Sequence, residues 1–144
     1  MLYKLRPVFI LLTLLSQPVV AECIPTPHRT TGTHYKPVTV EMTDISKGEI
    51  FRGRILAAPD CKPVAHARVA HWQAGENGRY VDRLRAYMFT DAEGRYQFET
   101  EWPNLFSPHI HFIVTADGYR KLETQWVGDE RQANIEFDMV LVRE

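Results

Sequence analysis

Residues 99–114 have the sequence E-T-E-W-P-N-L-F-S-P-H-I-H-F-I-V, with His109-Ile110-His111 at the centre. Successive side chains of a β-strand point to opposite faces, so the two histidines would share one face, roughly 7 Å apart along the strand. The three residues that follow, Phe-Ile-Val, favour a strand. Two imidazoles arranged in this way can bind one metal ion, although H-x-H alone more often marks a strand whose polar face carries two histidines.

Short, alternating apolar runs recur along the chain and are separated by turn sequences such as D-A-E-G at 91–94 and D-G at 117–118. We expect strands at residues 38–42, 50–57, 67–72, 87–89, 95–99, 110–116, 122–126 and 135–141. No segment has a convincing helical periodicity, so any helix should be a single turn. The pattern predicts an all-β fold, an immunoglobulin-like or transthyretin-like β-sandwich of about seven to nine short strands.

The first 21 residues have the features of a secretory signal peptide. Lys4 and Arg6 provide the charged start, residues 8–20 are mostly apolar, and Val19-x-Ala21 is a small-residue cleavage site. An uncleaved anchor is the alternative, but the apolar run is too short to span a membrane. We therefore expect an exported protein, periplasmic or extracellular, with no membrane contact after cleavage.

Cleavage would leave a proline-containing extended arm at 22–37, which should lie over the domain, and one domain at 38–144. The whole chain carries 17 Lys and Arg against 18 Asp and Glu. Loss of Lys4 and Arg6 would make the formal charge about −3, which argues against nucleic acid as a partner. The sequence leaves the oligomeric state open, a homo-oligomer included.

Both cysteines, Cys23 and Cys61, lie in the part of the chain that would be exported. In an oxidising compartment, an even pair without C-x-x-C spacing predicts one disulfide. That bond would hold the arm against the domain. The alternative is two separate buried thiols.

A metal on His109 and His111 needs further ligands from elsewhere in the chain. Tyr80, in G-E-N-G-R-Y, follows the predicted 67–72 strand and stands on a loop that could reach across to the histidines. A phenol has a pKa of about 10, but a hard trivalent ion such as Fe³⁺ makes loss of its proton favourable. The alternative for Tyr80 is an aromatic residue at the surface.

Several motifs follow one another in a fixed order after the signal sequence. They are C-x-P-T-P at 23–27, C-K-P-V-A-H-A-R-V-A-H-W-Q-A at 61–74, G-R-Y at 78–80, T-D-A-E-G-R-Y-Q-F-E-T at 90–100, Pro103, H-I-H-F at 109–112 and T-Q at 124–125. This ordered set resembles the intradiol ring-cleavage dioxygenases, in particular short, exported relatives of the protocatechuate dioxygenase β subunit.

The resemblance implies a non-haem Fe³⁺ held by two tyrosinates and two histidines. It also implies insertion of both atoms of O₂ between the hydroxyl-bearing carbons of a catechol. His109 and His111 match the histidine ligands, Tyr80 matches the first tyrosine, and Gln125 matches a glutamine near the substrate pocket. The expected metal ligands are therefore Tyr80, His109 and His111, the expected catalytic residues are Tyr80 and Gln125, and the expected partners are a catechol-like aromatic and O₂.

The chain departs from the family at the second tyrosine, which follows T-x-x-P-x-x in the family and is Phe106 here. Only Ser107 and Pro108 separate Phe106 from His109, so the arginine that the family has just before H-x-H is absent too. If the chain cleaves catechols, the Phe106 ring should lie at the rim of the metal site, in the space of the missing tyrosine. With a single tyrosinate, Fe²⁺ or Zn²⁺ could replace Fe³⁺.

Three residues could substitute for the missing ligand. Tyr87 is otherwise expected to be a packed strand aromatic, His71 a satisfied core histidine, and His34 a solvated residue of the arm. Two functions follow from the whole pattern. One is an intradiol dioxygenase; the other is a β-sandwich of the same family that has lost turnover and binds a metal, an aromatic ligand or a protein.

Overall fold

The computed structural model describes residues 21–144, so the expected signal peptide lies almost entirely outside the described residues. Nine strands follow in order: β1 (Glu49–Ala57), β2 (Lys62–Pro63), β3 (Arg68–Ala74), β4 (Tyr80–Phe89), β5 (Arg95–Thr100), β6 (His109–Thr115), β7 (Leu122–Val127), β8 (Asn134–Glu136) and β9 (Met139–Leu141). Residues 21–144 contain no helix. The predicted all-β class is confirmed.

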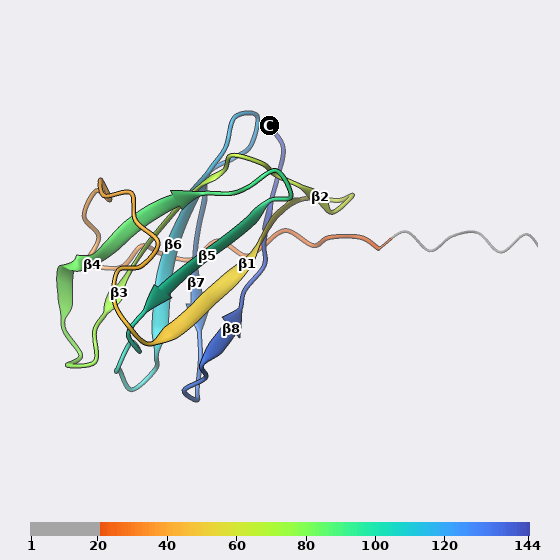
Figure 1. The fold of residues 1–144 in the computed structure, drawn as a ribbon. Helices are drawn as coiled ribbons and strands as arrows, with labels where there is room; N and C mark the ends of the chain where they lie inside the picture. Colours follow the sequence, from red (N-terminus) through yellow and green to blue (C-terminus); the bar gives the residue numbers. More distant parts are fainter. Residues whose placement is uncertain (1–20) are drawn as a thin grey trace, which may run out of the picture.

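The strands form two sheets that lie face to face (Figure 1). One is a four-stranded antiparallel sheet in the order β4-β3-β6-β7. In the other, β1 pairs with β2 and β5 in antiparallel fashion and with β8 and β9 in parallel. The two faces that meet carry the alternate apolar residues of each strand, which is the arrangement of a β-sandwich.

The core lies between the two sheets and is rich in aromatic side chains. Phe51 of β1, Phe98 of β5 and Phe112 of β6 are almost completely buried, and the Phe51 and Phe98 rings stack with centroids 5.3 Å apart. Because Ile110 and Phe112 turn inward, the intervening side chain of His111 is directed to the outer face of the four-stranded sheet.

The strand predicted at 87–89 begins earlier, at Tyr80 in β4, and two further strand predictions need correction. Residues 38–42 form no strand: a single bridge joins Glu41 to Tyr87 at the edge of β4, and the chain then continues toward β5. The 135–141 run is divided into β8 and β9. Oδ1 of Asp138 accepts the Arg54 backbone N–H at 2.7 Å, in place of a strand carbonyl, and this side chain interrupts the ladder.

The arm, residues 22–37, crosses the outer face of the four-stranded sheet from the β7 side to the β4 side (Figure 1). At β7, the Arg29 backbone N–H donates to Glu123 O at 2.8 Å and the Thr124 hydroxyl donates to Pro27 O at 2.9 Å. Beyond the arm, the Tyr87 N–H of β4 donates to Val40 O at 2.9 Å. Residues 22–37 thus contact the outer face of the four-stranded sheet at both of its edge strands.

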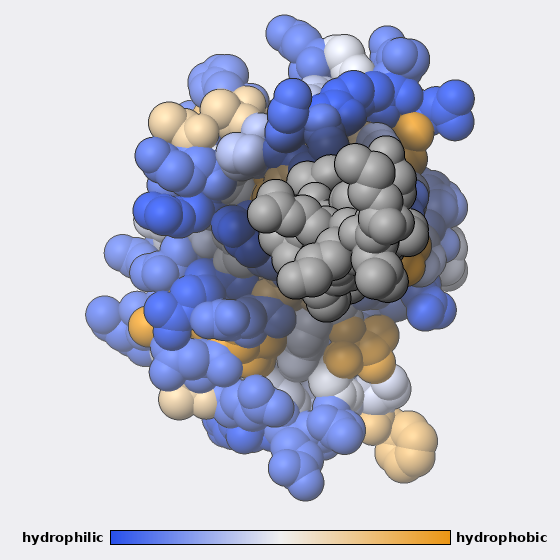
Figure 2. All heavy atoms as spheres, turned by 90° about the vertical axis from the view of Figure 1, so that its right-hand side faces the viewer, coloured by the Kyte–Doolittle hydropathy of each residue, from blue (hydrophilic) through white to orange (hydrophobic). Residues whose placement is uncertain are grey.

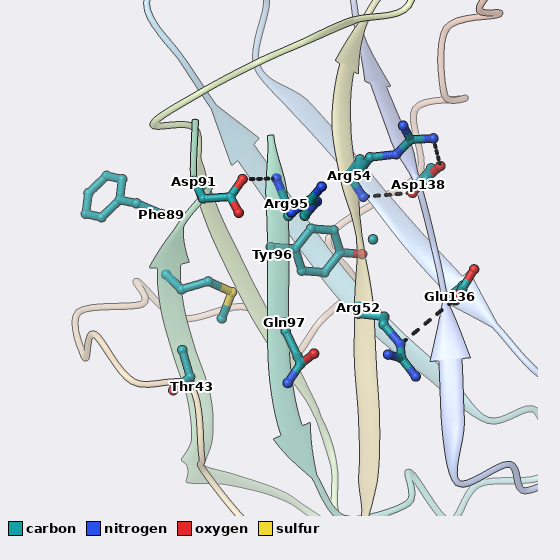
Figure 3. Close-up of a pocket in the computed structure, with 12 residues that line it drawn as sticks. Thr43, Arg52, Arg54, Phe89, Asp91, Arg95, Tyr96, Gln97, Glu136 and Asp138 are labelled. Carbon is teal, nitrogen blue, oxygen red and sulfur yellow. Dashed lines mark hydrogen bonds and ion pairs between the residues drawn. The ribbon is translucent and has the colours of Figure 1, made fainter. Parts of the chain in front are cut away.

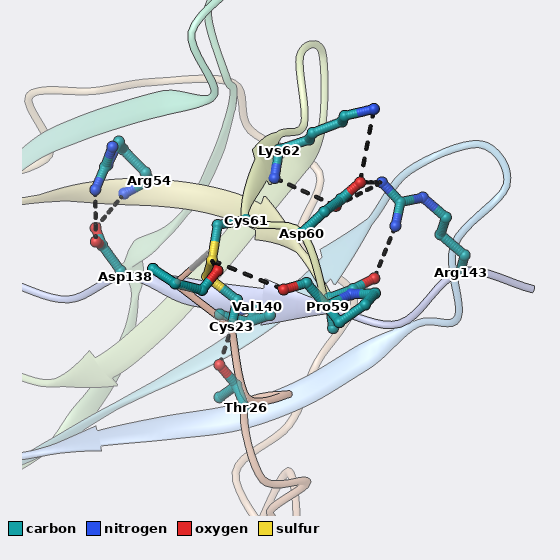
Figure 4. Close-up of a disulfide and its surroundings, with 12 residues drawn as sticks. Cys23, Thr26, Arg54, Pro59, Asp60, Cys61, Lys62, Asp138, Val140 and Arg143 are labelled. Carbon is teal, nitrogen blue, oxygen red and sulfur yellow. Dashed lines mark hydrogen bonds and ion pairs between the residues drawn. A yellow bond between two sulfur atoms is a disulfide. The ribbon is translucent and has the colours of Figure 1, made fainter. Parts of the chain in front are cut away.

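The predicted Cys23–Cys61 disulfide is present, with the two Cα atoms 5.1 Å apart (Figure 4). Next to it, the Thr26 hydroxyl accepts the Val140 N–H at 2.8 Å. The start of the arm is thus held covalently and by hydrogen bonds.

Residues 21–144 include no helix long and apolar enough to cross a membrane. The face shown in Figure 2 is mostly hydrophilic, with small and separate hydrophobic patches.

Candidate metal centre

The candidate site lies on the outer face of the four-stranded sheet, where one row of residues crosses all four strands. Strand register places Arg85 of β4 opposite Trp72 of β3, Trp72 opposite His111 of β6, and His111 opposite Gln125 of β7. The His111 imidazole stacks on Trp72 with ring centroids 5.0 Å apart and planes 6° apart. This stack fixes the plane of the imidazole.

Tyr80 meets the two histidines with its phenol oxygen. Its Oη lies 2.9 Å from Nε2 of His109 and 3.3 Å from Nε2 of His111. Tyr80 was expected on a loop but is the first residue of β4, opposite Ala74 and next to a register shift between Trp72 and Ala74. β3 lies between β4 and β6 in the sheet, so the Tyr80 side chain reaches across β3 to the two histidines. The role of Tyr80, His109 and His111 as metal ligands stays a prediction.

The local contacts of His109 define which nitrogen is free. Its Nδ1 lies 2.9 Å from the carbonyl oxygen of Ser107, which can only accept, so Nδ1 carries the proton. Nε2 of His109 therefore presents a lone pair toward Tyr80. A backbone carbonyl on the far nitrogen is the usual way to orient a metal-binding imidazole.

His111 is buried, and this burial, with a smaller contribution from neighbouring His109, lowers its pKa to about 4. At neutral pH the ring is uncharged, the form that binds metals. Its Nδ1 is buried without a hydrogen-bond partner among the described residues. The Tyr80 hydroxyl has one proton, so it can donate to only one of the two Nε2 atoms; if both rings carry their proton on Nδ1, one cation could engage both Nε2 lone pairs.

Tyr80 is half-buried, and this burial raises the pKa of its phenol, opposed by the positive charge of Arg85. Without a metal, the phenol keeps its proton at neutral pH. A bound cation would have to displace that proton, as a tyrosinate ligand requires.

A second set of residues, which no sequence motif indicates, holds the loop before Tyr80. The carboxylate of Glu101 accepts the Glu76 N–H at 2.8 Å and forms an ion pair with Arg83. Its backbone carbonyl accepts a 2.6 Å hydrogen bond from Nε2 of buried Gln73. Arg83 lowers the pKa of the Glu101 carboxyl, so it is ionised at neutral pH. No short motif marks such a network, because its members come from β3, β4 and the segment after β5.

Gln125 lies beside the centre, as its position in the row requires. Its Nε2 donates to the Thr30 carbonyl oxygen of the arm at 2.9 Å. The side chain is thus in contact with the arm, and its Oε1 stays available for another donor. A catalytic role for Gln125 stays a prediction.

The three proposed substitute ligands have different positions. Tyr87 packs beneath the guanidinium of Arg68, 4.0 Å from the ring centroid, as a packed aromatic. His71 is in the core, fully buried and stacked on Phe98 at 3.8 Å. It is not satisfied as expected: neither ring nitrogen has a partner among the described residues. His34 is exposed but not merely solvated, because it stacks on Tyr80.

The expected position of Phe106 is wrong. Its side chain is fully exposed and does not fill a space beside Tyr80 and the histidines. The short connection to His109, with Pro108 buried, turns the ring outward. Phe106 therefore does not line the candidate centre.

The converging donor set of two imidazole nitrogens and one phenol oxygen fits iron, because imidazole suits iron and a phenolate suits a hard trivalent ion. Among residues 21–144, no group of three or more His, Cys, Asp or Glu could hold a metal, so the set depends on Tyr80. Two imidazoles and a phenolate would leave further coordination positions for water or a substrate.

A hollow of about 640 Å³ lies away from this centre, on the other sheet (Figure 3). It is lined partly by Arg52, Arg54 and Arg95, with the Tyr96 ring among them. Arg54 pairs with Asp138 at 3.5 Å and Arg52 approaches Glu136 at 3.9 Å. The arginines there face acidic neighbours, so the hollow presents no net positive charge for an anion.

The sequence and the fold are similar to those of intradiol ring-cleaving dioxygenases. No protein-family model matches the sequence. The chain is 34% identical over 112 residues to a catechol 1,2-dioxygenase of Acinetobacter lwoffii, covering 58% of this chain and 40% of that protein. It is 35% identical over 100 residues to the protocatechuate 3,4-dioxygenase beta chain of Burkholderia cepacia, covering 53% and 42%.

Solved structures agree in fold. The dioxygenase domain of a dioxygenase–carbohydrate-binding fusion from Streptomyces sp. SirexAA-E superposes with a TM-score of 0.74 at 23% identity, covering 83% of this chain and 99% of that one. A 3-chlorocatechol 1,2-dioxygenase from Rhodococcus opacus 1CP gives 0.72 at 18% identity, covering 83% and 73%.

These findings confirm the resemblance: the chain is a relative of the intradiol dioxygenases and has their fold. It spans about two fifths of the length of the curated relatives it matches.

Proposed function

We propose that this protein is an exported, non-haem iron dioxygenase of the intradiol type. It would act on a catechol-like aromatic compound, with O₂ as the oxidant, and open the ring between the two hydroxyl-bearing carbons. Both oxygen atoms would enter the product, a dicarboxylic acid, so no further reductant is needed. Fe³⁺ is the expected metal, with Fe²⁺ or Zn²⁺ as alternatives.

One observation carries the proposal: Nε2 of His109 and Nε2 of His111 both lie within 3.3 Å of the phenol oxygen of Tyr80. They do so in a chain whose sequence relatives are named as catechol and protocatechuate dioxygenases. Tyrosinate is a rare ligand because of its high pKa, so its coincidence with two outward-facing histidines is more specific than H-x-H alone.

Each residue has a definite task in this proposal. His109 and His111 would hold the iron through Nε2, with His109 oriented by the Ser107 carbonyl. Tyr80 would bind as tyrosinate, after release of the phenol proton. Bound iron would supply the Lewis acidity that makes a catechol hydroxyl acidic. Gln125, next to His111, would hydrogen bond to the substrate through Oε1.

Export is supported by the disulfide, because such bonds persist in oxidising compartments. A periplasmic or extracellular location is therefore part of the proposal. Light scattering of the purified protein would show whether it forms a homo-oligomer.

The alternative function is a binding module for a metal, an aromatic ligand or a protein. The exposed Phe106 ring favours it, because no second tyrosine occupies that position and the side chain does not reach the centre. The donor set would then bind a metal without turnover.

The deciding experiment combines metal analysis, a visible spectrum and oxygen uptake. Tyrosinate bound to Fe³⁺ gives a charge-transfer colour that Zn²⁺ or an empty site cannot give. Iron-loaded protein should show this colour and consume O₂ with catechol or protocatechuate, and both atoms of labelled O₂ should appear in the product.

Two variants give the matched comparison. His111→Ala should lose the metal and the oxygen uptake. His66→Asn should keep both, because His66 stacks on Phe89 away from the centre and Asn tolerates its positive φ of 53°. If the unaltered protein takes up iron but consumes no more oxygen than His111→Ala, it is a binding module.

A further inference from the structure

His34 of the arm lies face to face on the phenol ring of Tyr80. The ring centroids are 4.2 Å apart and the planes differ by 8°. Tyr80 is the first residue of β4 and follows a register shift, so its backbone has less support than one inside a regular ladder. A flat ring stacked on the phenol restricts the directions in which Oη can point.

The position of His34 is itself held from the sheet. Nη2 of Arg85 donates to the His34 carbonyl oxygen at 2.7 Å. Arg85 is buried, with 7% of its surface exposed. Nε and Nη1 of Arg85 have no hydrogen-bond partner among the described residues, so the bond to the His34 carbonyl is the one hydrogen bond that this buried guanidinium forms there, and its loss would be costly.

Two more contacts fix the arm just before His34. The Thr30 carbonyl accepts from Gln125, and Gly32 lies directly over His111. A Cβ on Gly32 would stand 3.3 Å from Cε1 of His111, and its φ of +72° suits glycine. The segment 30–34 thus follows the row of site residues closely, from β7 to β4.

We propose that His34 is a positioning residue for Tyr80. Its ring holds the phenol so that Oη points at Nε2 of His109 and of His111. The inference concerns the same site as the proposed function and deepens it by adding the arm to the centre. The stack joins two of the protein's own side chains, so the role of His34 can be tested in protein without a metal.

Three variants separate stacking from other effects of the arm. His34→Ala removes the ring, whereas His34→Phe keeps a flat ring and removes the nitrogens. His28→Ala is the matched control: it removes another imidazole from the arm, one that is 65% exposed and lies near Glu123.

The first readout needs no metal. In protein with ¹⁵N-labelled histidine, the Nε2 resonances of His109 and His111 report their hydrogen bonding with Tyr80 Oη, and Tyr80→Phe gives the values for its loss. His34→Ala should move these resonances toward those of Tyr80→Phe. His34→Phe and His28→Ala should leave them at the values of the unaltered protein.

The second readout uses Fe³⁺. His34→Ala should shift the tyrosinate charge-transfer band and weaken Fe³⁺ binding roughly tenfold, the lower end of the range for residues that orient ligands. His34→Phe should restore both. Unchanged histidine resonances in His34→Ala, or a His34→Phe variant that behaves like His34→Ala, would overturn the proposal. Failure of the unaltered protein to take up iron in either oxidation state would refute the proposed function, while the metal-free comparison would still decide the role of His34.

Discussion

The carboxylate of Glu101 accepts the backbone N–H of Glu76 at 2.8 Å, and so the segment after β5 holds the loop that leads into Tyr80. The same carboxylate pairs with Arg83 and accepts from the Ser46 hydroxyl at 3.2 Å. One buried acid therefore joins four separate parts of the chain beside the candidate centre. Replacement of Glu101 should therefore lower the stability of the fold and alter the direction in which the Tyr80 side chain points.

Glu101→Ala should lower the free energy of unfolding by about 1–3 kcal/mol, because the Glu76 N–H loses its acceptor and Arg83 its partner. Urea unfolding at pH 7 gives the measurement. Glu93→Ala, in the exposed turn before β5, should change little. Equal unfolding free energies for these two variants would contradict the role assigned to Glu101.

The same contact should appear in the pH dependence of stability. Arg83 lowers the pKa of folded Glu101 below its unfolded value, so the folded protein binds fewer protons over that interval. The stabilisation is present above the unfolded pKa and is lost as pH falls through the folded pKa. Glu101→Ala should therefore lose less stability than the unaltered protein on acidification below about pH 4.5.

His71 should make the fold sensitive to acid at higher pH than the carboxylates do. Burial lowers its pKa to about 3, while in the unfolded chain the pKa is about 6.5. Between these values the unfolded chain binds the extra proton, so stability should fall by up to about 1.4 kcal/mol for each unit that the pH falls. His71→Leu should remove this slope, as measured by urea unfolding from pH 7 to pH 4.

His28→Ala is the control for that measurement, since this imidazole is largely exposed and its removal leaves the core unchanged. A His71→Leu variant with the same slope between pH 6.5 and pH 4 as His28→Ala would show that the core histidine does not titrate on unfolding.

Much of the fold could be predicted because strand periodicity is local. Ile110 and Phe112 turn into the core, which sends His109 and His111 outward, as alternation requires. The disulfide could be expected because the sequence has two cysteines without C-x-x-C spacing. Tyr80 was misplaced on a loop because the register shift in β4 depends on its pairing with β3, which no local pattern records.

The surroundings of the site were harder to predict than its members. His34 and Tyr80 are 46 positions apart in sequence, and their stack depends on the path of an arm that forms no strand of its own. Glu101 is an ordinary acidic residue in sequence, and only the packed structure shows its partners. The outward turn of Phe106 follows from the short connection to β6, where a resemblance alone suggested a residue facing the metal.

The disulfide should stabilise the attachment of the arm to the domain more than the hydrogen bonds of the arm do. It closes a loop with a sequence separation of 38 residues, which the chain-entropy account values at about 4 kcal/mol. The double variant Cys23→Ser/Cys61→Ser should lower the unfolding free energy by up to this amount, measured in urea. A reducing agent should destabilise the unaltered protein similarly and leave the double variant unaffected; equal stability with and without the bond would contradict this.

Phe106→Tyr should leave the candidate centre unchanged, contrary to what the resemblance suggests. Because the Phe106 side chain is fully exposed, a hydroxyl added to the ring would enter solvent and not approach Tyr80 or the histidines. The unfolding free energy should change by less than about 0.5 kcal/mol, the usual range for surface substitutions. The visible spectrum of the Fe³⁺-loaded variant should match that of the unaltered protein, whereas Tyr80→Phe should abolish the tyrosinate band. A deeper colour in Phe106→Tyr would mean that residues 104–108 rearrange when the metal binds, since only then could a second phenolate reach it.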